Sequence, residues 1–64
     1  MPIVEVTLIE GRSHDAKKQM VVAVTDAIVA SLGAPREAVR IIIREVPAYH
    51  FAAGGALKGE PSGG

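Results

Sequence analysis

The sequence predicts an α/β (α+β) fold, a single β–α–β unit that occupies one domain, residues 1–64. Two β-branched segments, 2–9 and 39–46, flank a segment whose apolar residues recur at helical spacing. A chain of 64 residues has room for one domain only. Because two strands joined through a helix normally run parallel, we expect a parallel pair with a right-handed crossover.

The first strand, 2–9, has two unlike faces. One face is wholly apolar and should pack on the protein's own helix; it carries Pro2, Val4, Val6 and Leu8. The other face is mixed, as suits a surface covered by a partner; it carries Ile3, Glu5, Thr7 and Ile9. The turn that follows, Glu10-Gly11-Arg12, ends the strand.

The helix should begin after Ser13, a suitable N-cap, and Asp15 favours its first turn. From Ala16 the apolar residues recur at Met20, Val24, Ala27 or Ile28, and Leu32, and further valines widen the stripe, so more than one side could be covered. Gly33 is expected to close the helix, and Pro35 prevents its continuation.

The second strand, 39–46, follows a short turn at 35–38 and ends at Pro47. Residues 50–55, which include Gly54-Gly55, should form a turn or short hairpin. The tail, 59–64, has no apolar anchor, and we expect it to be mobile.

Composition favours a soluble oligomer. Two parallel strands and one helix leave a sheet face and two edges uncovered, and the chain has no cysteine for disulfides. Seven basic residues balance seven acidic ones, so nucleic acid is not an expected partner. No apolar run could span a membrane and no signal-peptide pattern is present, so we expect a cytoplasmic protein.

Common catalytic motifs are lacking. Ser13-His14-Asp15 are sequence neighbours, and adjacent residues assemble a triad poorly, so a helix cap is the better interpretation. His14 and His50 have no accompanying cluster of carboxylates, which argues against a metal site.

Three other residues could carry chemistry. Arg12 lies in a turn and Arg40 in an apolar strand, and a guanidinium binds carboxylates bidentately. Arg40 could equally be paired with Glu5 or Glu45. Pro2 would become the chain end if Met1 were removed, and an α-amino group, with a pKa near 8, can act as a base at neutral pH. Their spacing alone is also consistent with purely structural roles for these three residues.

The chain resembles the 4-oxalocrotonate tautomerase (2-hydroxymuconate tautomerase) family. The similar segments are Met1-Pro2-Ile3-Val4-Glu5-Val6, Leu8-Ile9-Glu10-Gly11-Arg12-Ser13, Ala34-Pro35 with 39–46, and His50-Phe51 with Gly54-Gly55. The similarity covers about residues 2–57 and rests on length, order and spacing together. It implies the β–α–β tautomerase fold with a C-terminal hairpin, a four-stranded sheet in each dimer, and a homohexamer built as a trimer of dimers.

The resemblance also implies roles and a substrate, a small dicarboxylate enol of aromatic hydrocarbon catabolism. Pro2 would be the general base and acid that converts 2-hydroxymuconate to 2-oxo-3-hexenedioate without metal or cofactor. Arg12 would bind the remote carboxylate, and Arg40 of a neighbouring subunit the other carboxylate and the carbonyl oxygen. Phe51 would line the pocket, and the backbone amide of Ile9 would approach a substrate oxygen.

Alternatives remain beside this hypothesis. The family often has Gly-Ile-Gly-Gly after the aromatic residue, whereas Ala52-Ala53-Gly54-Gly55 stands here, so the shapes of the hairpin and the pocket are open. Another enol or α-keto acid could be the substrate. Acrylate-hydrating relatives carry an additional carboxylate just after the aromatic residue, which is missing here. A catalytically silent oligomer is a further possibility, and the role of Arg44 is open. A small dimeric DNA-binding protein would need a second long helix and a basic strand face.

Overall fold

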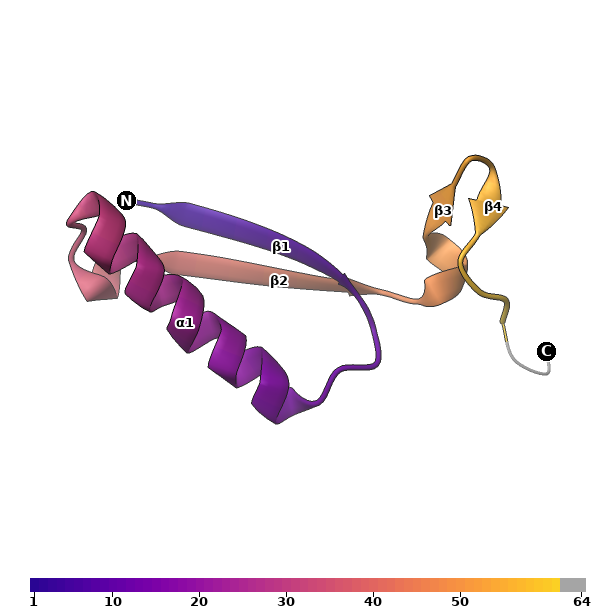
Figure 1. Ribbon diagram of the computed structural model, residues 1–64, viewed down its shortest axis with the longest axis horizontal. Coiled ribbons are helices and arrows are strands. Elements are labelled where there is room, and N and C mark those ends of the chain that lie inside the picture. The colour runs from indigo at the N-terminus through magenta and orange to yellow at the C-terminus, as the bar shows by residue number, and fades with distance from the viewer. Residues whose placement is uncertain (62–64) are drawn as a thin grey trace.

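The computed structural model describes residues 1–61 and contains a β–α–β unit followed by a short hairpin (Figure 1). The elements are β1 (Ile3–Ile9), α1 (His14–Leu32), the 3₁₀ turn η1 (Arg36–Ala38), β2 (Arg40–Val46), the 3₁₀ turn η2 (Ala48–His50), β3 (Ala52–Ala53) and β4 (Ala56–Leu57). β1 and β2 form one parallel sheet, and β3 and β4 form a separate antiparallel one. The predicted fold class is confirmed.

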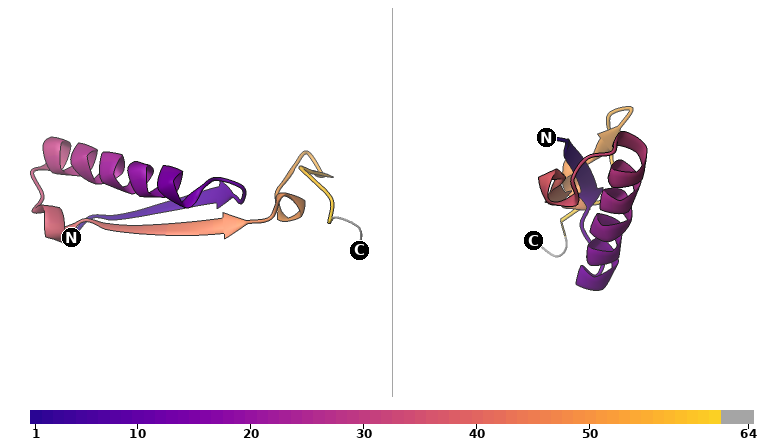
Figure 2. Two further views of the ribbon diagram at one scale, coloured as in Figure 1. Left: turned by 90° about the horizontal axis from the view of Figure 1, so that it is seen from below. Right: turned by 90° about the vertical axis from the view of Figure 1, so that its left-hand side faces the viewer.

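The two long strands are paired over their whole length, from Ile3 opposite Arg40 to Ile9 opposite Val46. α1 lies across one face of this pair and leaves the other face bare (Figure 2). Exposure alternates along β1 as far as Leu8 and along β2 as far as Arg44, as the pleat requires. The half-buried residues under the helix are Val4, Val6, Leu8, Ile41 and Ile43. The predicted apolar face of the first strand therefore packs on the helix.

Both predicted ends of the helix are confirmed. The Ser13 hydroxyl accepts a hydrogen bond from the backbone N–H of Ala16 at 3.1 Å, which satisfies one of the free donors of the first turn. At the other end Gly33 adopts a left-handed conformation with φ 69°, and its N–H donates to the carbonyl of Val29 at 3.0 Å. Glycine adopts this conformation without a Cβ penalty.

The chain is too extended to bury a core by itself. None of the residues described is fully buried, and the molecule measures 47 × 26 × 13 Å. Its radius of gyration is 15.3 Å, whereas a compact domain of this length has about 11 Å. Its accessible surface is 4765 Å², whereas a compact 6.7 kDa monomer exposes about 3,900 Å². The excess, roughly 900 Å², indicates a chain that is shaped for contact with other chains.

Residues 47–61, called here the C-terminal arm, project from the far end of the sheet (Figure 1). Gly54 and Gly55, with φ 60° and 83°, form the two-residue turn of the hairpin, and β4 extends it to Leu57, beyond the predicted 50–55. The apolar side chains of the arm are exposed: Tyr49, Phe51 and Leu57. Of the predicted mobile tail, residues 59–61 lie outside helices and strands, and 62–64 lie outside the described residues.

Between residues 1 and 61 the structure has no helix that is long and apolar enough to cross a lipid bilayer.

Candidate functional site

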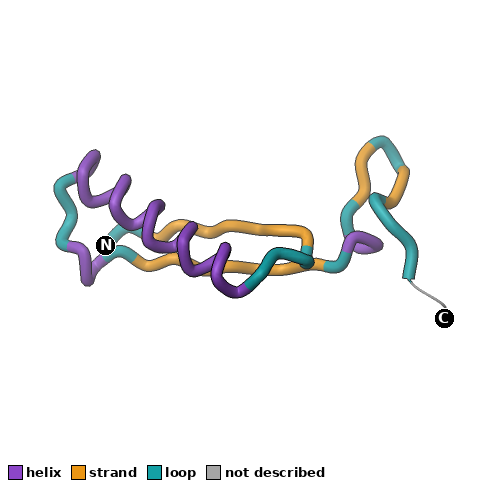
Figure 3. The backbone as a smooth tube through the Cα atoms, turned by 60° about the horizontal axis from the view of Figure 1, so that its bottom comes forward, coloured by secondary structure: helices purple, strands orange, loops and turns teal. Residues whose placement is uncertain are grey.

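Pro2 and Arg40 lie at the same end of the sheet. The backbone N–H of Arg40 donates to the carbonyl of Pro2 at 3.0 Å, the first bond of the parallel ladder. The N-terminus therefore sits beside the turn that leads into β2 (Figure 3). Pro2 is half-buried, whereas Arg40 is exposed. This proximity brings one predicted base and one predicted anion-binding residue to a common end of the molecule.

The two side chains nevertheless belong to opposite faces of the sheet. Pro2 shares the helix-covered face with Val4, while Arg40 pairs with Ile3 on the bare face. Arg40 Nη1 donates to the carbonyl oxygen of Glu37 at 2.5 Å, so its guanidinium is directed toward the preceding turn. This orientation leaves the guanidinium exposed at the rim of the bare face, where a second molecule could reach it.

Arg12 lies at the other end of β1. Seven residue steps separate Pro2 from Ile9, which is about 23 Å at about 3.3 Å per residue. Arg12 follows after a further turn and lines a shallow groove of about 330 Å³ between β1 and the start of α1, together with Leu8, Ala16, Lys17 and Met20. A short diacid cannot bridge Pro2 and Arg12 of the same chain.

Ile9 is the last residue of β1, near Arg12, and its backbone N–H points away from β2. The N–H of Glu10 donates to the carbonyl of Val46 on β2 at 2.8 Å. Since successive N–H groups of a strand point to opposite edges, the N–H of Ile9 points to the free edge of β1. A backbone donor is thus available at this edge for a ligand or another chain.

Three ion pairs determine which arginines are free to bind an external anion. Arg44 Nη2 lies 3.1 Å from Glu5 Oε1, Lys17 Nζ 2.9 Å from Glu45 Oε1, and Arg36 Nη1 2.6 Å from Asp26 Oδ1. The alternative that Arg40 is paired with Glu5 or Glu45 is therefore wrong. Throughout residues 1–61, neither Arg12 nor Arg40 has a carboxylate within ion-pair distance.

Phe51 lies on the C-terminal arm and is 45% exposed. The arm leaves the sheet after Val46, which pairs with Ile9. Phe51, Ile9 and Arg12 therefore lie toward the same end of the strand pair. Pro2 and Arg40 are at the opposite end. The structure thus separates the candidate residues into two groups, one at each end of the sheet.

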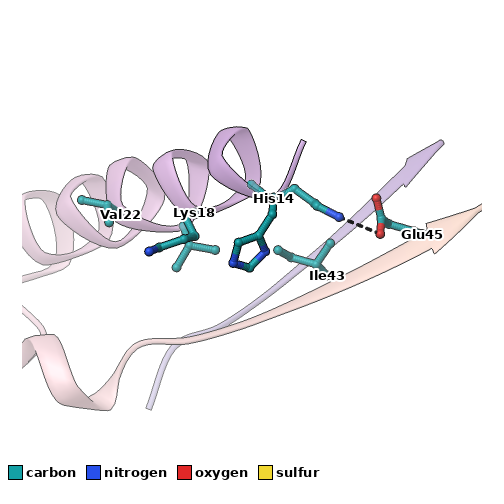
Figure 4. Close-up of a pocket in the computed structure, with 7 residues that line it drawn as sticks. His14, Lys18, Val22, Ile43 and Glu45 are labelled. Atoms are coloured by element: carbon teal, nitrogen blue, oxygen red, sulfur yellow. Dashed lines mark hydrogen bonds and ion pairs between the residues drawn. The ribbon is translucent and has the colours of Figure 1, made fainter. Parts of the chain in front are cut away.

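The sequence did not indicate a groove of about 430 Å³ between α1 and β2 (Figure 4). Its lining is His14, Lys17, Lys18, Val21, Val22, Ile43 and Glu45, and the Lys17–Glu45 ion pair crosses one end. The residues come from segments far apart along the chain, so no local motif marks them. No three metal-ligating side chains come together anywhere in the part of the chain that is described.

The fold and this distribution of residues can be compared with known proteins. The family description of tautomerase enzymes matches residues 2–60. The chain belongs to the tautomerase family. A probable tautomerase of Ralstonia nicotianae is 55% identical over 58 residues, 91% of this chain and 83% of the relative. The 2-hydroxymuconate tautomerase of Stutzerimonas stutzeri is 46% identical over 55 residues, 86% of this chain and 87% of the relative.

A solved structure of the family shows the same fold. It is the heterohexameric 4-oxalocrotonate tautomerase of Chloroflexus aurantiacus, with a TM-score of 0.87 and 36% sequence identity. The alignment covers 91% of this chain and 94% of the other. The tautomerase fold inferred from the sequence is thereby confirmed, and that relative is a hexamer in which the chains are of more than one kind.

Proposed function

We propose that this tautomerase converts 2-hydroxymuconate to 2-oxo-3-hexenedioate, with Pro2 as general base and acid once Met1 has been removed. The observation that carries the proposal is the availability of Arg12 and Arg40, the two arginines that no carboxylate holds within residues 1–61. A dianionic substrate needs two cations, one for each end. The named activity of the relative from Stutzerimonas stutzeri supports this choice of substrate.

In the proposed reaction, the amine of Pro2 removes a proton from the enol hydroxyl and returns it at C-5. Arg40 stabilises the negative charge that grows on the carbonyl oxygen, which is where electrostatic help lowers the barrier most. Arg12 holds the remote carboxylate, Phe51 keeps water away, and the amide of Ile9 donates to a substrate oxygen. The proton transfers need no metal or organic cofactor.

The proposed active site is shared between chains of a homohexamer, a trimer of dimers. Two observations support sharing: Pro2 and Arg12 are separated by the length of β1, and the chain exposes roughly 900 Å² more than a compact monomer. That excess is close to the area each partner buries in an ordinary stable interface. The bare sheet face and the C-terminal arm are the surfaces that assembly would cover.

A second candidate substrate is another enol or α-keto acid. The observation that favours it is Ala52-Ala53, which follows Phe51 directly and forms β3, so these residues would shape the wall of the pocket. A panel of enols compared by kcat/KM separates the two candidates, and inactivity on all of them would indicate a silent oligomer. We expect the enzyme to act in the cytoplasm, in keeping with its lack of cysteine.

The experiment that tests the proposal compares protein that begins at Pro2 with protein whose intact mass includes Met1. With Met1 attached, the nitrogen of Pro2 is a tertiary amide and has no basic lone pair. We expect the trimmed form alone to convert 2-hydroxymuconate, with kcat/KM rising with pH as the amine loses its proton. Equal activity of the two forms would eliminate Pro2 as the base.

A further inference from the structure

The guanidinium of Arg40 is held by a turn that is itself held on the helix. η1 immediately precedes β2, and the carbonyl of its central residue, Glu37, accepts the hydrogen bond from Arg40 Nη1. The preceding residue, Arg36, donates through Nη1 to Asp26 Oδ1 on α1 at 2.6 Å. The Asp26–Arg36 pair, Glu37 and Arg40 therefore form one continuous chain of contacts.

Ala38, the last residue of η1, is half-buried, but the first two residues of η1 have few other contacts. The two backbone hydrogen bonds of η1, from Ala38 to Pro35 and from Val39 to Arg36, are both local. Arg36 and Glu37 are exposed and bury no side chain against the core. Within the described residues, the Asp26–Arg36 pair is the one side-chain hydrogen bond that joins η1 to α1. This pair is the side-chain link between α1 and the residue that precedes the Glu37 carbonyl.

We propose that Asp26 and Arg36 are a positioning pair for Arg40, acting through the carbonyl of Glu37. The inference rests on the function proposed for Arg40 in the tautomerase reaction. The side chains of Arg36 and Asp26 are 55% and 60% exposed, and such exposed pairs contribute little to global stability. Their effect is on geometry, because a small displacement of a group that stabilises the transition state costs rate disproportionately.

The variant that tests this is Arg36→Met, which keeps an unbranched apolar stem and removes the guanidinium with its charge. The matched control is Arg44→Met, which breaks the Glu5 pair, whose side chains are 55–56% exposed. Arg44 lies on the same face of β2 as Arg40 but does not contact η1. We expect Arg36→Met to lower kcat about three- to tenfold with little change in KM, and the control to stay within about twofold of the parent.

Rescue distinguishes positioning from a general loss of structure. Arg36→Lys should retain most of the activity, since it can still reach Asp26. The charge-swapped double variant Asp26→Arg/Arg36→Asp should recover part of kcat, whereas each single change should lower it. Equal losses in Arg36→Met and Arg44→Met, or no recovery in the double variant, would overturn the proposal.

A spectroscopic measurement does not depend on turnover. NMR of the Arg40 guanidinium in the assembled protein should show restricted rotation about its Cζ–Nε bond, lost in Arg36→Met and kept in Arg44→Met. If the parent protein lacks tautomerase activity but shows this pattern, the proposed function fails and the structural coupling stands. If the parent is active and Arg36→Met changes neither the Arg40 signal nor kcat, the positioning role is wrong.

Discussion

A mixture of a variant without the base and a variant without the cation for the remote carboxylate should exceed the average kcat/KM of the two if Pro2 and Arg12 of one site come from different chains. The first variant is Pro2→Leu, whose bulky second residue keeps Met1 attached, so that the nitrogen at position 2 is an amide and not a base. The second is Arg12→Ala, which removes the cation for the remote carboxylate. The separation of about 23 Å along β1 makes a site within one chain impossible for a diacid whose carboxylates are four carbon atoms apart.

The expected magnitude follows from random assembly. A site is intact when its Pro2 comes from an Arg12→Ala chain and its Arg12 from a Pro2→Leu chain. At equal proportions each condition is met half the time, so about a quarter of the sites should have both residues. Mixed oligomers should then show about a quarter of the parent kcat/KM per site, whereas each variant alone shows far less.

The assay is tautomerisation of 2-hydroxymuconate after the two chains have been unfolded together and refolded. Each variant refolded alone provides the baseline, and mass spectrometry of the intact oligomer verifies that mixing has occurred. If verified mixed oligomers are no more active than the average of the two variants, then either one chain supplies both residues or neither residue is required. Both outcomes would refute the shared site.

Three further predictions concern single properties of the protein. Arg40→Ala should lower kcat on the order of 10²-fold, while Arg12→Ala should mainly raise KM, and more for diacids than for monoacids; identical kinetics for the two variants would contradict these roles. Sedimentation at micromolar concentration should show an oligomer, and a folded 6.7 kDa species would exclude it. Ser13→Ala should reduce the free energy of unfolding in urea by about 1 kcal/mol per chain, because the N–H of Ala16 loses its acceptor, whereas an unchanged value would mean that the cap contributes nothing.

Local chemistry made most of the fold predictable from the sequence. Ser13 and Gly33 mark the ends of the helix because each supplies a hydrogen-bonding group or a backbone conformation that neighbouring residues could not. Alternation along the first strand identified which of its side chains lie under the helix. These properties depend on a few adjacent residues and need no knowledge of the partner strand.

The pairing of charges could not be predicted in the same way. Glu5 and Glu45 were both plausible partners for Arg40. The register places Glu5 opposite Ile42, between Arg40 and Arg44, but Arg40 donates to the carbonyl of Glu37 instead, and the helix brings Lys17 to Glu45. Register and helix placement are decided by packing of the whole unit. The Asp26–Arg36 pair was missed for the same reason, since the two residues meet only after the chain has turned at Gly33 and Pro35.

The position of Tyr49 gives the protein an internal optical reporter. It is the only tyrosine, there is no tryptophan, and it lies on the C-terminal arm, 38% exposed, with its ring 4.9 Å from that of His50 in an edge-on arrangement. Ultraviolet emission of the unlabelled protein therefore originates almost entirely from one ring. Any change of its intensity on dilution, or when a dicarboxylate is added, follows the surroundings of the arm without interference from the sheet or the helix.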